Sequence, residues 1–181
     1  MIITITGPPG SGKSTIARLL CEKLNLKHYS VGDFRRKIAE KRGITLEELN
    51  KEDEKTGETD RLADEWQKKL GKTENNFVID GRLPAYFIPN SVKIFLKVDP
   101  KVGAERVIKY RNGSAVEKYK NIEDAVVKMH QREESDKKRY RNLYGVEYDK
   151  LDFDLIIDTT NDNPESIVKK ILEFAKKPQT F

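Results

Sequence analysis

The sequence predicts an α/β fold, in which helices pack against a parallel sheet, and two observations lead to this expectation. First, residues 1–6 form a β-branched apolar run that passes directly into a glycine-rich loop and then into an amphipathic helical pattern. Second, further short apolar runs alternate with helical stretches along the chain, which is the order typical of βαβ units. The length of 181 residues suits one domain with at most a small insertion.

Residues 7–15 form the most specific motif, because they fit the pattern G-x-x-x-x-G-K-[ST] in full. Glycines in such a loop let the backbone turn sharply and bring its N–H groups close to phosphate oxygens. A helix that begins near Lys13 adds the positive end of its dipole, Lys13 adds a mobile charge, and Ser14 offers a hydroxyl to Mg²⁺. A chance Gly/Pro turn beside a lysine is the alternative. The residues expected to contact the phosphates of ATP or GTP are Gly7, Pro8, Pro9, Gly10, Ser11, Gly12, Lys13, Ser14 and Thr15.

The composition excludes several classes of protein. Hydrophobic and charged residues each make up 36% of the chain, and the net charge is +5. No apolar run approaches the roughly 20 residues of a membrane span, and no signal peptide precedes the first strand, so we expect a cytoplasmic protein. Cys21 is the only cysteine, which excludes disulfides within one chain, and its spacing places it in the core. Because lysines and glutamates are interleaved, we expect anionic small molecules as partners rather than nucleic acid. We also expect a monomer.

The strands and helices are assigned in order from periodicity and caps. Apolar runs predict strands over residues 1–6, 77–80, 91–98 and 153–158, and residues 27–30 are read as a short second strand. Thr45 and Glu48 form a capping box at the start of a short helix, and prolines after Asx residues predict helix starts at Pro100 and Pro164. The helices are expected over residues 13–24, 31–41, from 45 onward, 60–70, 100–111, 122–139 and 164–175.

The helix predicted over residues 31–41 carries unusual charges at its start. Asp33 is either a helix cap or a ligand contact. Arg35 and Arg36 lie in the first turn, where cations oppose the helix dipole unless an anion lies nearby. We therefore expect at least one of these two arginines to contact a phosphate.

The helical segment over residues 60–70 combines apolar and acidic positions. Its acidic residues, Asp60 and Asp64, form either a solvated face or part of a binding site. The apolar residues expected to pack are Leu62, Trp66 and Leu70.

The strand over residues 77–80 ends in a carboxylate. In phosphate-loop folds an aspartate at this point, here Asp80, holds Mg²⁺ directly or through water. Gly81 lets the chain turn, and Arg82 follows at the carboxyl edge of the sheet, where open α/β sheets bind ligands. A local turn pair between Asp80 and Arg82 is the alternative.

The helix capped by Asn121 changes character along its length. Its apolar stripe continues as Arg132, Asp136 and Arg139, which share one face. We expect this helix to leave the core and enter a polar cavity, where guanidinium groups can clamp phosphoryl oxygens. An exposed salt bridge is the alternative. Residues 112–121 before it are expected to form a short mobile loop.

Taken together, these motifs resemble the nucleoside monophosphate kinases, and most closely the archaeal-type cytidylate kinases. The resemblance covers nearly the whole chain and rests on the order of the segments 7–15, 30–36, 60–67, 78–82 and 132–139. It implies a single domain over residues 1–181 with a three-layer P-loop kinase fold and a five-stranded parallel sheet in the order 2-3-1-4-5. It also implies a helical arm over residues 31–71 that binds the monophosphate, and a short lid over about residues 112–121.

The resemblance also implies roles for particular residues. Lys13, Arg132 and Arg139 would act on the transferring phosphoryl group, and Ser14 and Asp80 would hold Mg²⁺, directly or through water. Leu83 stands where bacterial relatives carry an aspartate at the cytosine. The implied substrate-binding residues are Asp33, Arg36, Arg61, Asp64, Arg82 and Asp136.

The implied activity is transfer of the γ-phosphoryl group of ATP·Mg²⁺ to CMP, and also to dCMP, giving CDP and ADP. A kinase for UMP or AMP shares every phosphate argument, and only the base pocket separates it. An adenylate-kinase-like assembly or RNA-processing ATPase would not need Arg36 and Arg82 at a second phosphate site. A nucleic-acid-binding module would require a contiguous basic stripe, which the sequence lacks.

Overall fold

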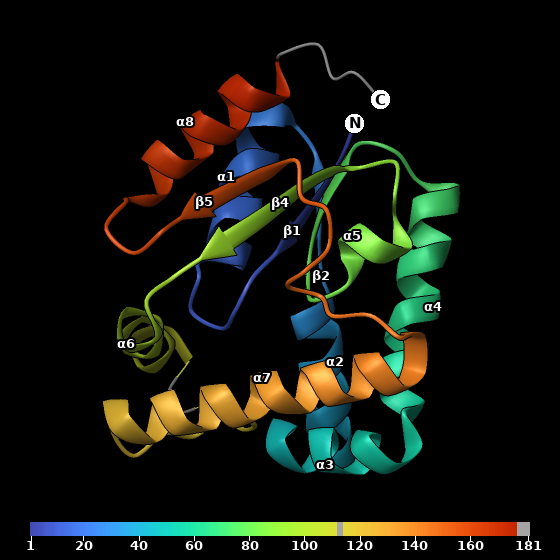
Figure 1. The fold of residues 1–181 in the computed structure, drawn as a ribbon, viewed down its shortest axis with the longest axis vertical. Helices are drawn as coiled ribbons and strands as arrows, with labels where there is room; N and C mark the ends of the chain where they lie inside the picture. The colour runs from blue at the N-terminus through green and yellow to red at the C-terminus, as the bar shows by residue number, and fades with distance from the viewer. Residues whose placement is uncertain (112–113, 177–181) are drawn as a thin grey trace.

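The computed structural model, which describes residues 1–111 and 114–176, is built on one five-stranded parallel sheet. Helices cover both faces of the sheet (Figure 1), so the domain has three layers. The strand order is β2-β3-β1-β4-β5, and each neighbouring pair is parallel. This confirms the predicted α/β class and the order 2-3-1-4-5. The strands are β1 (Ile2–Thr6), β2 (Lys27–Ser30), β3 (Phe77–Asp80), β4 (Val92–Lys97) and β5 (Leu155–Asp158).

Each predicted helix is present, although several ends differ. The last two strands are shorter than predicted, and the single turn α5 is absent from the predicted order. The helices of the described residues are α1 (Lys13–Leu24), α2 (Val31–Arg42), α3 (Leu46–Thr56), α4 (Glu58–Thr73), α5 (Pro84–Phe87), α6 (Pro100–Arg111), α7 (Ile122–Tyr144) and α8 (Pro164–Ala175).

The sheet is buried on both faces. Ile3 and Ile5 of the central strand β1 are fully buried, as a strand covered on both sides requires. They pack with the apolar stripes of α1 and α8, and Cys21 lies in this cluster as predicted. On the opposite face Phe77 and Ile79 of β3 pack against α2 and α4. The carboxyl ends of the strands are thereby held in one rigid edge.

Local signals in the sequence define several helix ends. Thr45 and Glu48 form both bonds of a capping box at the start of α3. The side chains of Asn121 and Asn163 accept backbone N–H groups at the starts of α7 and α8. Gly57 has a φ of 61°, a left-handed conformation that glycine adopts without strain, and it separates α3 from α4.

Helices α2, α3 and α4 are called the arm below. Helices α2 and α3 and the beginning of α4 lie beyond the carboxyl ends of β2 and β3, where α7 lies across them, and the rest of α4 runs beside the sheet (Figure 1). The N–H of Leu46 in α3 donates to the carbonyl of Val116 at 3.0 Å, and Val116 packs with Leu49. The described part of the predicted lid, residues 114–121, is thus joined to the arm. Its first two residues, 112–113, lie outside the described residues.

Helix α4 turns a polar stripe inward. Leu62 is 52% exposed, so the packing predicted for it is wrong, whereas Leu70 is buried and Trp66 stacks on an aromatic ring of α2. Asp60 and Asp64 are both buried on the inner face of α4, so the solvated-face alternative is wrong for them. The predicted apolar stripe therefore packs only in the second half of α4, and near its start the buried positions are taken by Asp60 and Asp64.

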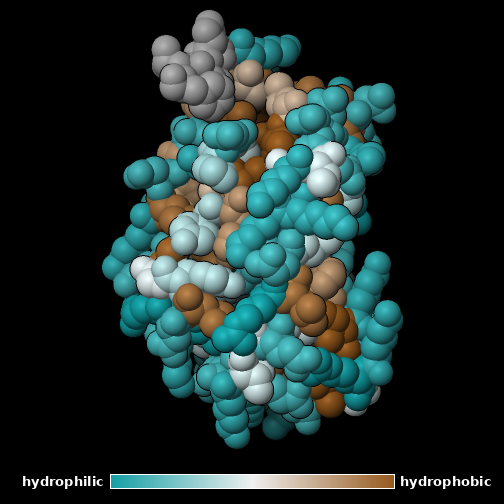
Figure 2. Space-filling model, turned by 90° about the vertical axis from the view of Figure 1, so that its right-hand side faces the viewer, coloured by the Kyte–Doolittle hydropathy of each residue, from teal (hydrophilic) through white to brown (hydrophobic). Residues whose placement is uncertain are grey.

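Hydrophilic side chains cover most of the surface seen in Figure 2, and apolar side chains form separate patches between them. This distribution agrees with a chain in which 36% of the residues are charged. Among the described helices, none combines the length and apolar character that crossing a membrane would require.

Candidate active site

The glycine-rich motif connects β1 to α1 at the carboxyl edge of the sheet. Gly7, Gly10 and Gly12 have φ values of 152°, 74° and 86°, which other residues rarely adopt. A Cβ on Gly7 would collide with the carbonyl of Leu96, and one on Gly10 with the backbone of Gly103. The loop therefore takes its shape because glycine lets it pack directly against β4 and α6.

Helix α1 begins at Lys13, so the positive end of its dipole meets the loop. The Nζ atom of Lys13 donates to the carbonyl oxygens of Gly7 at 2.8 Å and Pro8 at 2.6 Å. These contacts hold a full positive charge against the loop. Together with the backbone N–H groups, they make the loop a site for anions.

Asp80 is the centre of a polar cluster at the ends of β2 and β3. Its carboxylate accepts from Ser14 at 3.0 Å and from Ser30 at 3.3 Å, and it contacts Nε2 of His28 at 2.7 Å. The sequence identified Ser14 and Asp80 but treated His28 as an ordinary strand residue. Only the pairing of β2 with β3 brings His28 to this carboxylate.

The oxygens of Ser14 and Asp80 fit a Mg²⁺ ion. Neighbouring ligands of an octahedral Mg²⁺ lie about 2.9 Å apart, close to the 3.0 Å that separates Ser14 Oγ from Asp80 Oδ2. The described residues contain no group of three or more His, Cys, Asp or Glu side chains that could hold a metal by themselves. This donor set suits Mg²⁺, which keeps several waters and takes other ligands from nucleotide phosphates.

A cavity of about 860 Å³ lies over the phosphate loop. Residues 10–15 form its floor, and Asp33 and Arg36 form part of its wall. Asp33 and Arg36 are joined to each other by an ion pair at 2.6 Å. The cavity extends to Tyr110 of α6 and Pro164 of α8, so its lining comes from helices that are far apart in the sequence.

Arg106 of α6 lines the same cavity, and sequence reasoning did not identify it as a site residue. Its guanidinium donates to the carbonyls of Thr159 at 2.7 Å and Thr160 at 3.2 Å, which follow β5. A longer contact of 3.4 Å reaches the carbonyl of Gly10. Arg106 thus joins three segments that are far apart in the sequence, and no local pattern marks it.

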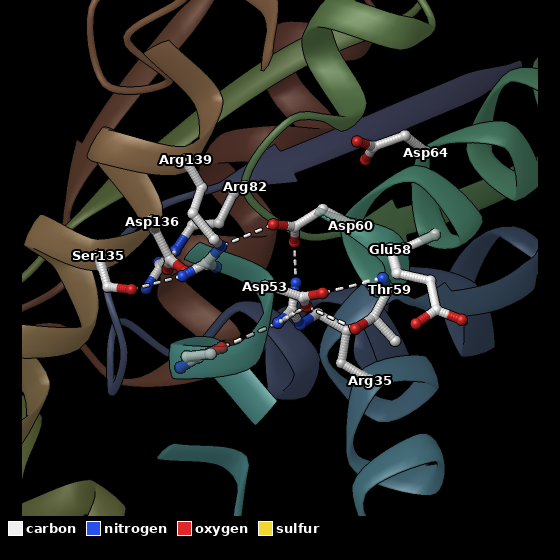
Figure 3. A network of polar contacts seen from close by, with 12 residues as sticks. Arg35, Asp53, Glu58, Thr59, Asp60, Asp64, Arg82, Ser135, Asp136 and Arg139 are labelled. Atoms are coloured by element: carbon white, nitrogen blue, oxygen red, sulfur yellow. Dashed lines mark hydrogen bonds and ion pairs between the residues drawn. The ribbon is translucent and has the colours of Figure 1, made fainter. Parts of the chain in front are cut away.

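Arg82, Asp136 and Arg139 form a buried network beside the loop (Figure 3). Asp136 of α7 accepts from Arg82 Nε at 2.8 Å and from Arg139 Nη2 at 2.6 Å. Arg82 Nη1 donates to the carbonyl of Gly7, which links the network to the phosphate loop. The local Asp80–Arg82 pair considered above does not occur, because Arg82 turns toward α7 instead.

The network continues into the arm (Figure 3). Asp60 of α4 accepts from Arg139 Nε at 2.6 Å with one oxygen and from Arg35 Nη1 with the other. Arg35 also donates to Asp53 at 2.8 Å and to Asn50 at 2.9 Å, both in α3. A single chain of contacts therefore crosses from α2, α3 and α4 to α7.

Burial and charge shift two carboxyl groups in opposite directions. Burial raises the pKa of Asp136, but the Arg82 and Arg139 guanidinium groups outweigh it and hold the pKa below its usual range. For Asp64, burial dominates and raises the pKa to about 6, although Tyr144 donates to it at 2.7 Å. Asp136 is thus a firmly ionised partner, whereas Asp64 can take up a proton near neutral pH.

Other predicted residues have separate partners. Arg132 pairs with Glu117 at 2.9 Å beside a second cavity, of about 400 Å³, between α3 and α7. Arg61 donates to the carbonyl of Thr56 at 2.7 Å and lies at the surface. Leu83 is buried in an apolar cluster with two tyrosines.

The structure thus divides the predicted site residues into groups. Asp33, Arg36 and residues 10–15 line the cavity over the loop, and Asp80 meets Ser14 beside it. Arg82, Asp136 and Arg139 form the buried network that touches the loop at Gly7. Arg61 and Asp64 have contacts outside both groups, whereas the partner of Arg132, Glu117, lines the cavity over the loop as well as the second cavity.

Comparison with known proteins identifies the family. The sequence profile of the cytidylate kinase-like family matches residues 2–161. A cytidylate kinase from Archaeoglobus fulgidus is 39% identical over 175 residues, which cover 96% of this chain and 93% of the relative. A cytidylate kinase from Methanothrix thermoacetophila is 41% identical over 160 residues, which cover 88% of each chain.

A solved structure shares the fold at lower identity. Shikimate kinase from Bacteroides thetaiotaomicron matches with a TM-score of 0.61 at 22% identity, over 97% of this chain and 98% of that one. This likeness supports the P-loop kinase fold alone. The sequence matches reach further, because they span most of both chains and include the loop and the segment after β3. The chain belongs to the cytidylate kinase-like family.

Proposed function

We propose that this protein transfers the γ-phosphoryl group of ATP to CMP, and also to dCMP. The observation that carries the proposal is the position of Arg82, which donates to the Gly7 carbonyl of the phosphate loop while Asp136 holds its Nε atom. Arg36 lies on the wall of the cavity over the same loop. The loop binds the phosphates of the donor, and the two guanidinium groups beside it can bind the phosphate of a second nucleotide. An ATPase that acts as a switch binds one nucleotide and does not require this second phosphate site.

The reaction follows from positioning and charge. The loop N–H groups and Lys13 bind the donor phosphates, and Arg36 and Arg82 bind the acceptor monophosphate. An oxygen of that monophosphate is already ionised, so no general base is needed for its attack on the γ-phosphorus. The new P–O bond forms as the bond to the β–γ bridging oxygen breaks, and ADP leaves. Arg132 and Arg139 neutralise charge on the transferring group.

Ser14 and Asp80 would hold Mg²⁺ beside the loop. When bound, the ion neutralises charge on the β- and γ-phosphates. His28 and Ser30 orient the Asp80 carboxylate through their own contacts with it.

The acceptor nucleoside would be held by residues of the arm and α7. Asp136 is ionised and can accept from sugar hydroxyls with its remaining lone pairs. Asp33, Arg61 and Asp64 complete the proposed acceptor site. Base recognition does not use a side-chain carboxylate at position 83, because Leu83 is packed in an apolar cluster.

The direct test is a coupled assay of the purified protein with ATP and a panel of CMP, dCMP, UMP and AMP. We expect CMP to give the highest kcat/KM, with dCMP or UMP next. If AMP exceeds CMP, the protein is a nucleoside monophosphate kinase of another specificity. If no monophosphate is phosphorylated while ATP is hydrolysed, the ATPase alternative is correct.

A second test separates the two phosphate sites. Arg36→Ala should raise the KM for CMP at least tenfold and leave ATP binding nearly unchanged, because Arg36 contacts only the acceptor in this proposal. Calorimetry with ATP alone, followed by CMP kinetics, measures both quantities. Equal loss of both ligands would mean that Arg36 supports the structure of the cavity instead. Arg42→Ala, on the exposed end of the same helix, is the matched control.

A further inference from the structure

Asp60 occupies an unusual position, because its two oxygens serve different helices. One accepts from Arg35 of α2, and the other accepts from Arg139 Nε of α7 at 2.6 Å. Asp60 is 1% exposed, and Figure 3 shows it between the two guanidinium groups. A buried carboxylate is stable only if its oxygens are paired, and here both are.

Arg35 is itself fixed, which makes Asp60 a rigid acceptor. Its Nη2 atom donates to Asp53 at 2.8 Å and to Asn50 at 2.9 Å, so α3 holds the side of the guanidinium that Asp60 does not use. All three helices of the arm therefore contribute to the placement of one carboxylate. The cluster is balanced, because the three arginines at positions 35, 82 and 139 face the three aspartates at positions 53, 60 and 136.

The hydrogen bonds of Arg139 within the network do not use all of its N–H donors. Its Nε donates to Asp60, its Nη1 to Ser135 and its Nη2 to Asp136, each at 2.6 Å. Arginine has five N–H donors, so the described network uses three and leaves one on each terminal nitrogen. That is the number a bidentate contact with phosphoryl oxygens requires. Asp136 accepts from both Arg82 and Arg139, and Arg82 also donates to the Gly7 carbonyl of the phosphate loop. Arg139 is therefore connected to the loop through Asp136 and Arg82.

We infer that Asp60 is a positioning residue for phosphoryl transfer, which sets the plane of the Arg139 guanidinium through its Nε atom. This inference rests on the proposed function and assigns Asp60 and its support Arg35 a role in it. Because Asp60 holds Nε, the terminal nitrogens of Arg139 keep one orientation when the nucleotides are bound. The rival arrangement is a latch, in which Asp60 holds Arg139 away from the nucleotides, since Arg139 is only 2% exposed.

The two arrangements predict opposite kinetics for Asp60→Asn, which keeps the shape of the side chain and removes its charge. Positioning predicts that kcat for CMP falls at least tenfold, while the KM for ATP stays within about twofold. A latch predicts that ATP hydrolysis without CMP rises. Either a wild-type kcat or a rise in CMP-independent hydrolysis would overturn the inference.

A double-mutant cycle tests whether Asp60 acts through Arg139. Arg139→Lys keeps the charge and loses the planar fork, so it should lower kcat by itself. If Asp60 positions Arg139, adding Asp60→Asn to Arg139→Lys should change kcat by less than about twofold. Losses of kcat that are fully additive would mean that Asp60 only supports the fold.

Asp53→Asn tests the support of Asp60 one step further out, because Asp53 is a similarly buried carboxylate bonded to Arg35 whose side-chain hydrogen bonds do not include Arg139. A loss of kcat that it causes through Arg35 and Asp60 should likewise shrink in the Arg139→Lys background, and a loss that persists there would mean that Asp53 only supports the fold.

Two further measurements complete the test. In NMR spectra of the ligand-free protein, the Nε–H of Arg139 should exchange slowly with water and should exchange faster in Asp60→Asn; an unchanged rate would overturn the inference without any use of activity. If Asp60→Asn unfolds, Asp60→Glu keeps the charge but moves it by one methylene, and positioning predicts a lowered kcat for it. A wild-type protein that makes no CDP would overturn the proposed function as well, whereas an active wild type with an unchanged Asp60→Asn overturns only this inference.

Discussion

At the scale of single residues, Arg35 and Arg36 show how adjacent positions take different roles. Side chains of consecutive helical residues point about 100° apart, so the two can face different surroundings. Arg36 lines the cavity over the phosphate loop, and Arg35 is buried against Asp53 and Asp60. The helix dipole disfavours both cations near the start of α2. Asp53 and Asp60 offset this for Arg35, and Asp33 offsets it for Arg36.

Lys13→Ala should lower kcat by about 10²–10³-fold, by analogy with the loss of one preorganised donor to developing charge. The fold should persist, because Lys13 contacts the carbonyls of Gly7 and Pro8 and takes no part in the apolar core. Steady-state kinetics and circular dichroism measure the two effects. A fully active variant would contradict the assignment of Lys13 to the donor phosphates, and an unfolded one would mean that its loop contacts are structural.

Asp64 should make stability fall as pH rises from about 4 to 7. Burial raises its pKa from 3.8 to about 6, so between these values the folded protein holds a proton that the unfolded chain has released. The stabilisation is complete below pH 4 and is lost as pH rises through 6. A shift of about two units corresponds to at most about 3 kcal/mol.

Urea unfolding of the wild type and of Asp64→Asn over this pH range measures the effect. Between pH 4 and pH 7 the free energy of unfolding of the variant should rise by about 2–3 kcal/mol relative to that of the wild type, because the amide cannot ionise. The difference between the two proteins isolates Asp64 from other carboxyls such as Asp136, whose lowered pKa acts in the opposite direction. A constant difference at all pH values would show that Asp64 titrates normally.

At the scale of elements, α7 connects the parts of the site. Its first turns pack on α6 through Ala125 and Met129, and its middle carries Asp136 and Arg139 into the network with the arm. The apolar stripe and the charged residues lie on the same face, so one helix extends from the apolar contacts with α6 to the buried network. Through its 23 residues, α7 thus joins the arm to the network beside the phosphate loop.

Glu54→Gln should loosen α3 from α7. Glu54 accepts from Ser135 at 2.7 Å and from Lys138 at 2.9 Å, and the amide keeps the shape but loses the ion pair. Because Lys138 is exposed, we expect a loss of at most about 1 kcal/mol, which corresponds to faster amide exchange in α3 by up to about fivefold. Hydrogen exchange with mass spectrometry measures it.

The matched control is Glu47→Gln on the same helix. Glu47 pairs with Lys51 within α3 at 2.8 Å, so its loss should leave the contact with α7 intact. Equal exchange in both variants would mean that Glu54 does not hold the arm to α7.

At the scale of the whole molecule, the strand order explains why distant segments meet. In the order β2-β3-β1-β4-β5, the central strand β1 carries the phosphate loop, and its neighbours β3 and β4 end beside it. Asp80 at the end of β3 therefore meets Ser14, and Arg106 reaches the loop from the helix after β4. Helices α2, α3 and α7 and the beginning of α4 lie beyond the same edge of the sheet (Figure 1).

Signals that act over a few residues determined much of this structure from the sequence alone. The phosphate loop and the caps at Thr45, Asn121 and Asn163 depend on local backbone chemistry, and they occur as predicted. The strands other than β2 follow from short apolar runs, which are typical of a buried parallel sheet. The family followed from the order of motifs, which is a property of the chain before it folds.

Only the tertiary structure decided the partners of the buried charges. A carboxylate or guanidinium inside a protein goes to whichever opposite charge the packing brings near, and that partner can be any number of residues away. Asp60 pairs with Arg139 from a position 79 residues earlier, Arg82 with Asp136 across 54, and His28 with Asp80 across 52. For the same reason Leu62, which spacing alone placed in the core, is exposed: the inner face near the start of α4 carries Asp60 and Asp64, and only further along does Leu70 enter the core.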